Sequence, residues 1–249
     1  MLPAERRDFL LARLRADGKI VAKELAAELG IAEDNIRRDL RDLAAAGLCQ
    51  RVYGGALPAA EAAADYATRT SVAPASKERV AARAAELIRP GMTVLLDGGT
   101  TALAVARRLP AVTVVTHSPT IAAALVDHPS AEVFLLGGRL FKHSAVTLGA
   151  ATAEAAARVS ADVFLLGVTG VHHRAGLTTG DPDEAAMKRT LASRAAETYV
   201  LASAEKIGAA SPFEVLPADA VTGVVTDVDG EHPELQRLRA AGVTVLTPS

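Results

Sequence analysis

Hydrophobic residues in the first part of the chain recur mostly at intervals of three and four. In residues 33–47 they form one apolar face, made of Ile36, Leu40 and Leu43. This spacing predicts an amphipathic helix, and Gly47 is expected to end it because glycine tolerates a positive φ. Residues 21–29 repeat the spacing, and residues 30–32 form a Gly-containing turn between the two segments. Helix, turn and helix in this order predict a helix-turn-helix unit.

A short strand-like run at residues 48–53, closed by Gly54 and Gly55, adds a wing to this unit. The polar residues of the second helix are expected on its other faces: Asn35, Arg37, Arg38, Asp39, Arg41 and Asp42. Arginine and asparagine bond both phosphates and base edges in double-stranded DNA. An arginine pair beside an aspartate is also common on an ordinary solvated helix face, but the complete winged unit favours DNA. The expected contacts are Asn35, Arg37, Arg38, Arg41 and, on the wing, Arg51 and Tyr53.

From residue 77 onward, short Val- and Leu-rich runs alternate with segments of helical periodicity. Strands are expected at residues 93–96, 112–115, 133–136, 163–166, 199–202, 221–226 and 243–246, with helices between most of them. This alternation predicts an α/β fold with a mainly parallel sheet covered on both faces. The expected organisation is a winged helix-turn-helix domain (1–57), an Ala- and Pro-containing linker (58–75) and a Rossmann-like α/β domain (76–249).

Polar and Gly-rich segments follow several of these strands, and ligands of parallel sheets bind at the carboxyl ends of strands. After the first strand come Asp97, Gly98, Gly99, Thr100 and Thr101. Such a turn suits an anion such as phosphate, although a plain tight turn explains it equally well. It is neither a P-loop nor GxGxxG, so a dinucleotide is not expected. Other segments supply His117, Ser118, Gly138, Arg139, Lys188 and Lys206. This set suits a phosphorylated sugar or polyol, while a solvated or core role for His117 and the lysines carries similar weight.

The composition of the chain restricts how it could bind DNA and which cofactors it could hold. Half of the residues are hydrophobic and the net charge is −2, and residues 1–56 hold ten Lys or Arg against nine Asp or Glu. DNA affinity must therefore come from the placement of a few arginines. Cys49 is the one cysteine, which fits a reducing cytoplasm, and no apolar run has membrane-spanning length. His172 and His173 lack Cys or acidic neighbours at ligand spacing, so neither a metal nor another cofactor is expected.

Residues 24–56, ELAAELGIAEDNIRRDLRDLAAAGLCQRVYGGA, resemble the N-terminal signature of the DeoR family of transcriptional regulators. Residues 77–109, VVTHS (114–118), LLGGRL (135–140) and GLTTGDPDEAAMK (176–188) resemble the sensor domain of the same family. The resemblance implies a homo-oligomeric repressor of carbohydrate genes whose sensor shares the fold of ribose-5-phosphate isomerases and CoA transferases. It also implies a sugar-phosphate effector, bound by positions that here are Asp97, Gly99, Thr100, Thr101, Ser118, Gly138, Lys188 and Lys206.

Several positions depart from the family pattern. Ala32 replaces the usual Ser and Asn35 the usual Thr, which removes a helix N-cap and alters an expected DNA contact. In the sensor, His117 replaces Asn and Ser203 replaces Asp. Two alternatives therefore stay open. One is a constitutive DNA-binding regulator with a degenerate sensor, and the other is a sugar-phosphate isomerase carrying a DNA-binding module, with Asp97 as base and Lys188 stabilising an enediolate. A regulator with no catalytic residue is the favoured interpretation.

Overall fold

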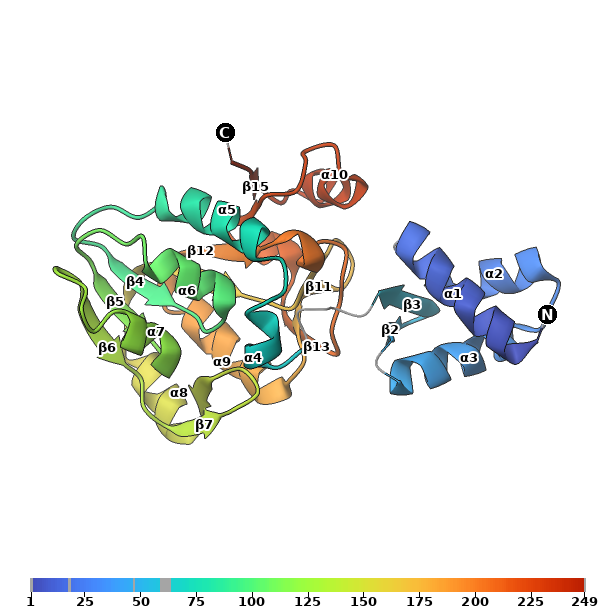
Figure 1. Cartoon of the computed structure of the whole chain (residues 1–249), viewed down its shortest axis with the longest axis horizontal. Helices are drawn as coiled ribbons and strands as arrows, with labels where there is room; N and C mark the ends of the chain where they lie inside the picture. The colour runs from blue at the N-terminus through green and yellow to red at the C-terminus, as the bar shows by residue number, and fades with distance from the viewer. Residues whose placement is uncertain (1, 18, 47, 59–63, 249) are drawn as a thin grey trace.

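The computed structural model describes residues 2–17, 19–46, 48–58 and 64–248. Figure 1 shows an N-terminal unit (blue) beside a larger α/β unit (teal to red). The N-terminal unit contains α1 (Pro3–Asp17), β1 (Ile20–Val21), α2 (Ala22–Leu29), α3 (Glu33–Ala45), β2 (Cys49–Val52) and β3 (Gly55–Pro58). Its strands form an antiparallel sheet in the order β1-β3-β2, which is the wing that the sequence predicts.

Helix α3 begins without a side-chain cap. Ala32 occupies the N-cap position in an extended conformation and makes no capping hydrogen bond, as the loss of the usual Ser predicts. Glu33 and Asp34 stand in the first turn, where negative charge is favourable. The C-cap is Ala46; the expected terminator Gly47 lies outside the described residues.

One expectation for α3 is wrong. Asp39, placed by periodicity on a polar face, is 4% exposed and forms an ion pair with Arg6 of α1. The apolar residues Ile36, Leu40 and Leu43 pack into the same interior with α1 and α2. Helix α1 therefore crosses α3 on the side of Asp39, and a buried charge is paired across that crossing.

Within the described residues, seven parallel strands form the central sheet of the α/β unit. Their order across the sheet is β15 (Val245–Leu246), β14 (Gly223–Thr226), β12 (Ala195–Ala202), β9 (Ala161–Gly167), β4 (Thr93–Leu96), β5 (Thr113–Thr116) and β6 (Glu132–Leu135). The strands are parallel because helices return the chain to the same edge: α5 (Pro74–Ala85), α6 (Thr100–Ala106), α7 (Pro119–Ala124), α8 (Ala150–Ala157), α9 (Pro182–Ala192) and α10 (Pro233–Ala240). The α/β fold class predicted from the sequence is confirmed.

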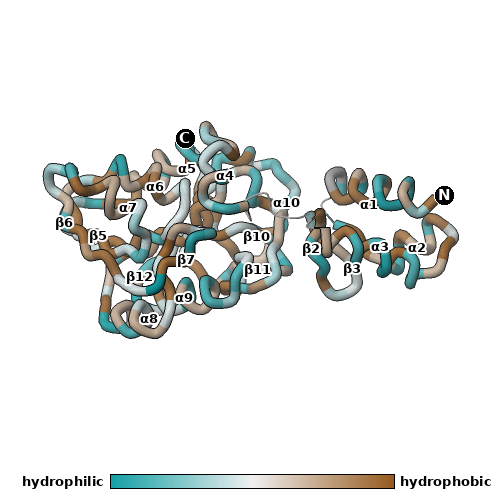
Figure 2. The backbone as a smooth tube through the Cα atoms, turned by 60° about the horizontal axis from the view of Figure 1, so that its bottom comes forward, coloured by the Kyte–Doolittle hydropathy of each residue, from teal (hydrophilic) through white to brown (hydrophobic). Residues whose placement is uncertain are grey.

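Two hydrophobic clusters lie on the two faces of the sheet. Val94 and Leu96 pack with Val80 of α5 on one face, whereas Leu95 packs with Leu191 of α9 on the other. Inner strands such as β4 and β5 are covered on both faces and are apolar at successive positions. The tube in Figure 2 is brown along much of β5 and also of β6, although the edge strand β6 is mostly exposed. None of the helices in the described part of the chain combines the length and apolar character needed to span a bilayer.

Smaller elements, absent from the sequence-based prediction, surround the carboxyl end of the sheet. They are the one-turn helix α4 (Tyr66–Arg69), the hairpin β7 (Arg139–Phe141) with β8 (Val146–Leu148), and the antiparallel sheet of β10 (Gly170–His172), β11 (Gly176–Thr179) and β13 (Phe213–Leu216). Helix α4 lies within the expected linker, and its first residue donates a backbone hydrogen bond to His143 O at 2.7 Å. This part of the linker is therefore attached to the α/β unit.

Candidate functional site

The arginines of α3 and the wing present an exposed cationic surface. Arg38, Arg41 and Arg51 are exposed and make no ion pair within the described residues. Arg38 and Arg41 are three positions apart and so share one side of the helix. Tyr53 at the wing tip is fully exposed. These side chains are free to meet a second molecule.

Two further predicted DNA contacts, Arg37 and Asn35, are less available: one is in an ion pair and the other is half-buried. Arg37 forms an ion pair with Glu33 at 2.7 Å, and Glu33 raises the pKa of the Arg37 guanidinium. Asn35 is half-buried near the start of α3. Both would have to reorient, or act through the side already exposed, to contact DNA.

A pocket opens at the carboxyl ends of β4, β9 and β12. Its lining includes six residues that the sequence singles out: Gly98, Gly99, Thr100, Thr101, Lys188 and Lys206. The predicted convergence of strand ends thus brings distant segments together. The cavity volume is about 30 Å³, which is room for roughly one or two water molecules.

Asp97 stands directly behind this pocket and is completely buried. Its Oδ1 accepts hydrogen bonds from Gly98 N at 2.8 Å and His117 Nε2 at 2.7 Å. Its Oδ2 accepts from Lys188 Nζ at 2.5 Å and Gly167 N at 2.9 Å. Burial alone would raise the pKa of Asp97, but Lys188 and His117 outweigh burial and hold that pKa below its ordinary value. Asp97 is an ionised anchor for Lys188.

His117, which replaces the family's usual Asn, does not line the pocket and is completely buried. Its Nδ1 lies 3.0 Å from Thr147 O and its Nε2 lies 2.7 Å from Asp97 Oδ1. Both ring nitrogens are thus within hydrogen-bond distance of an oxygen atom. His117 therefore joins β5 to the β7–β8 hairpin and orients Asp97.

The pocket also holds cations that sequence reasoning missed. Arg69 of α4 and Lys77 of α5 join Lys188 and Lys206 in its lining. Nε and Nη2 of Arg69 are buried without a hydrogen-bond partner within the described residues, as is Oγ1 of Thr101. Burial lowers the pKa of Lys206 to about 8 and also lowers that of Arg69. The only sequence signal for Arg69 was that it stands alone as a base between Arg51 and Lys77.

Two carboxylates face these cations. Glu184 accepts a hydrogen bond from Ser144 at 3.0 Å. Glu205 accepts one from Ser203 at 2.7 Å, while its second oxygen is buried without a partner. Ser203, which replaces the family's usual Asp, therefore supports a carboxylate two residues further along. Unpaired cationic and hydroxyl donors beside an unpaired carboxylate oxygen can bind an anion that also carries hydroxyl groups.

Besides Asp97 and His117, three more of the singled-out residues lie outside this lining. Ser118 is buried and its hydroxyl bonds Thr120 at 2.9 Å. Gly138 and Arg139 are exposed at the start of the β7–β8 hairpin. A Cβ at Gly138 would meet Thr152 Oγ1 at 1.9 Å, so close packing accounts for that glycine.

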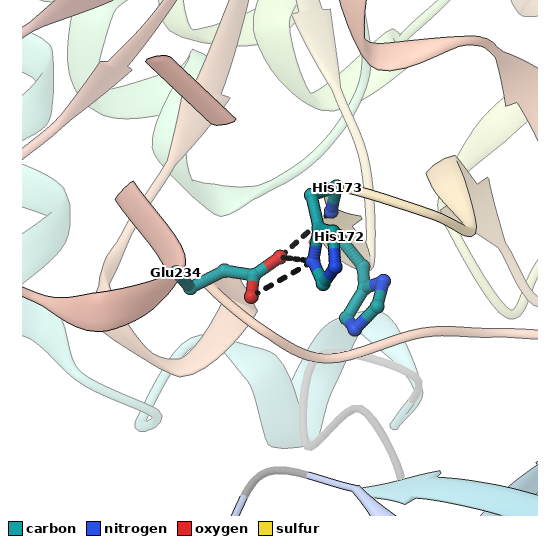
Figure 3. A group of neighbouring side chains, drawn as sticks. All are labelled: His172, His173 and Glu234. Carbon is teal, nitrogen blue, oxygen red and sulfur yellow. Dashed lines mark hydrogen bonds and ion pairs between the residues drawn. The ribbon is translucent and has the colours of Figure 1, made fainter. Parts of the chain in front are cut away.

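His172, His173 and Glu234 form a separate cluster (Figure 3). Glu234 accepts hydrogen bonds from His173 N at 2.7 Å and His173 Nδ1 at 2.9 Å. His172 Nδ1 accepts from the backbone N–H groups of Arg174 and Ala175, so its proton lies on Nε2. The three residues offer ligand atoms within 4.8 Å of one another, so the expectation that these histidines lack an acidic neighbour is wrong: α10 supplies Glu234 from a distant part of the sequence. The bonds to Glu234 attach the β10–β11 turn to α10.

The chain matches two sequence families: the DeoR-like helix-turn-helix domain over residues 6–61 and the DeoR C terminal sensor domain over residues 73–228. It is 32% identical over 252 residues to the HTH-type transcriptional regulator GlpR of Haloferax volcanii, covering 99% of this chain and 98% of that protein. It is 27% identical over 231 residues to the glycerol-3-phosphate regulon repressor of Escherichia coli K12, covering 91% and 92%. Among solved structures, ribose 5-phosphate isomerase A of Methanocaldococcus jannaschii is a distant likeness, with 19% identity over 52% of each chain and a TM-score of 0.39.

Proposed function

The chain belongs to the DeoR family of transcriptional regulators, and we propose that it represses carbohydrate-use genes by binding operator DNA under the control of a phosphorylated sugar or related metabolite. The observation that carries the effector part is the set of unpaired buried donors, Arg69 Nε and Nη2 and Thr101 Oγ1, beside three pocket lysines. Such donors are costly to bury unless a ligand satisfies them. A relative that represses the glycerol-3-phosphate regulon supports the same class of genes.

The operator contacts we propose come from α3 and the wing: Asn35, Arg37, Arg38, Arg41, Arg51 and Tyr53. The exposed, unpaired state of Arg38, Arg41 and Arg51 supports this assignment. One helix-turn-helix unit reads only a few base pairs, so a homo-oligomer would place a second unit on a second half-site. We expect such a regulator to work in the cytoplasm, where its operator lies.

The effector contacts we propose are the residues predicted from the sequence: Asp97, Gly98, Gly99, Thr100, Thr101, His117, Ser118, Gly138, Arg139, Lys188 and Lys206. The pocket supports direct contact for Thr101, Lys188 and Lys206 and a supporting role for Asp97 and His117 behind them. The proposed domain division is residues 1–57, 58–75 and 76–249, with the finding that α4 attaches part of the linker to the sensor.

An isomerase is the less favoured function. Its base would be Asp97, whose carboxylate accepts four hydrogen bonds and whose pKa is held below the ordinary value. Such a carboxylate is a weak base. This supports a regulator without catalytic activity, in which effector occupancy shifts DNA affinity by about 5- to 150-fold, corresponding to a coupling of roughly 1–3 kcal/mol.

The DNA-binding assignment is tested with labelled DNA from upstream of the protein's own gene and its neighbours. Arg41→Gln should weaken binding to the selected sequence by about tenfold, because a base or phosphate contact is worth roughly 1–3 kcal/mol. The control is Arg158→Gln, which changes an exposed arginine of α8 paired only with Glu154. Equal affinity of both variants and the unsubstituted protein would remove α3 from the interface.

A further inference from the structure

The chain reaches the pocket from the DNA-binding domain through a short segment, residues 64–73. Strand β3 ends at Pro58, and five residues of sequence separate it from this segment. Helix α4 occupies its middle, and Arg69 and Val72 line the pocket. The segment that connects the two domains therefore also contributes to the lining of the pocket.

Arg69 differs from most other buried or half-buried arginines of this protein because two of its guanidinium nitrogens have no hydrogen-bond partner within the described residues. Arg6, Arg83 and Arg194 all donate to carboxylates or carbonyls. The Nε and Nη2 donors of Arg69 have no partner within the described residues, and the aromatic ring of Tyr66 lies 5.9 Å from its guanidinium carbon. The nearest carboxylates, Glu184 and Asp97, act on it only at a distance. An unpaired guanidinium held in a pocket is a binding group for an anion.

The enclosed part of the pocket holds only roughly one or two water molecules, so a bound sugar phosphate would extend into the open side of the pocket or displace one of its walls. Gly98 lies just after β4 and Gly167 ends β9. Neither position has room for a side chain: a Cβ at Gly98 would meet Val146 at 2.1 Å, and one at Gly167 would meet Gly98 O at 2.9 Å. The walls on that side are fixed by the packing of the sheet.

Segment 64–73 is held more lightly. Its hydrogen bonds to the rest of the sensor include those that Tyr66 N donates to His143 O, that Lys77 N donates to Ala73 O and that Lys77 Nζ donates to Arg69 O. It ends at Ala73, which has a left-handed conformation with φ 44° and ψ 49°. A non-glycine residue in that region is strained.

We propose that Arg69 binds the anionic group of the effector and that segment 64–73 shifts as the effector enters, so that pocket occupancy reaches the wing through this segment. The inference rests on the proposed function for the existence of an effector, but it makes a separate claim about how the two sites communicate. Removing Arg69 should uncouple them, whereas removing a donor on the sensor should only weaken effector binding.

One comparison separates effector binding from its coupling to DNA affinity. The test variant is Arg69→Gln. The matched control is Thr101→Val, which removes another unpaired donor of the pocket and keeps the shape of the side chain. Operator affinity is measured for each variant without effector and at saturation, with glycerol 3-phosphate and glucose 6-phosphate as probes. The Thr101→Val protein should require a higher ligand concentration, but at saturation its DNA affinity should change as much as that of the unsubstituted protein. Arg69→Gln should need at least about tenfold more ligand and, at saturation, lose most of the change.

Equal changes at saturation in Arg69→Gln and the unsubstituted protein would overturn the coupling claim while leaving the regulator intact. No response of the unsubstituted protein to either probe would count against the proposed function instead. Should Arg69→Gln fail to fold, Arg69→Lys serves in its place, because it keeps the charge but loses the paired donors.

Limited trypsin digestion of the unsubstituted protein tests the same claim without any variant. Arg69 is the one Lys or Arg between Arg51 and Lys77, so cleavage after it reports on this segment alone. Inorganic phosphate, against chloride at equal ionic strength, should slow cleavage after Arg69 and leave cleavage after Arg158, which is exposed and outside the pocket lining, unchanged. Phosphate that binds the protein by calorimetry without slowing cleavage after Arg69, or that does not bind at all, would overturn the inference.

Discussion

Asp97→Asn should destabilise the sensor domain strongly, because it removes one charge from a completely buried pair. Lys188 is 4% exposed and its ammonium group lies 2.5 Å from Asp97 Oδ2. With Asn at position 97, that ammonium stays buried without a counter-charge, and an amide N–H₂ would face donors that now meet a carboxylate. Breaking a buried pair in this way costs about 3–5 kcal/mol.

The assay is urea denaturation at pH 7, followed by circular dichroism because the chain contains no Trp. Asp162→Asn is the matched control: Asp162 is exposed and accepts one hydrogen bond, from Thr93 N at 2.7 Å. Its loss should cost about 1 kcal/mol. A loss below about 1 kcal/mol for Asp97→Asn would refute the view that a buried charge pair holds this site together.

The pH dependence has a defined sign. The pKa of Asp97 is lower in the folded protein than in the unfolded chain, so the unfolded chain takes up the proton first as pH falls. The contribution of the carboxylate is complete above about pH 5 and is lost progressively below about pH 4. The stability difference between the unsubstituted protein and Asp97→Asn should therefore be constant from pH 7 to 5 and shrink in more acidic solution. A difference that grew with acid would contradict the assigned ionisation.

Three further predictions concern both domains. Ala32→Ser should stabilise the N-terminal domain by about 1 kcal/mol, because it supplies the missing N-cap of α3. Thermal unfolding measures this gain, and its absence would mean that Glu33 and Asp34 already stabilise the start of the helix. Arg6→Ala should cost about 3 kcal/mol by leaving the buried Asp39 carboxylate unpaired, again by thermal unfolding, and a neutral result would contradict the assigned ion pair. The affinity for a sugar phosphate should fall between pH 7 and 9, as Lys206, with a pKa of about 8, loses its charge; calorimetry that found constant affinity would exclude Lys206 as a phosphate ligand.

The sequence predicts the central sheet well because its strands are buried on both faces. A strand of that kind reads as an unbroken apolar run, as in residues 94–96 and 163–166. The hairpins β7–β8 and β10–β11 were not predicted because their strands are short. They also have Gly and Thr at buried positions, among them Gly170 and Thr178, so they do not form apolar runs in the sequence. Their pairing depends on tertiary contacts that no local pattern encodes.

The same limit applies to single side chains. Asp39 has the periodicity of an exposed residue, and only the crossing of α1 brings Arg6 to it. Arg69 lies in an Ala-rich stretch with little pattern, and the residues that share its pocket come from positions 72 to 206. The turn at residues 98–101 was predictable because strand ends of a parallel sheet must converge, whereas the contribution of the linker was not.

The most direct measurement is fluorescence anisotropy of labelled upstream DNA, titrated with the protein at fixed salt and then with a panel of sugar phosphates. Salt must be held constant because counterion release changes DNA affinity by itself. The account predicts tight, sequence-selective binding that one compound weakens by about 5- to 150-fold. Selective binding that no compound alters would contradict a functional sensor, and the absence of selective binding would contradict the regulator itself.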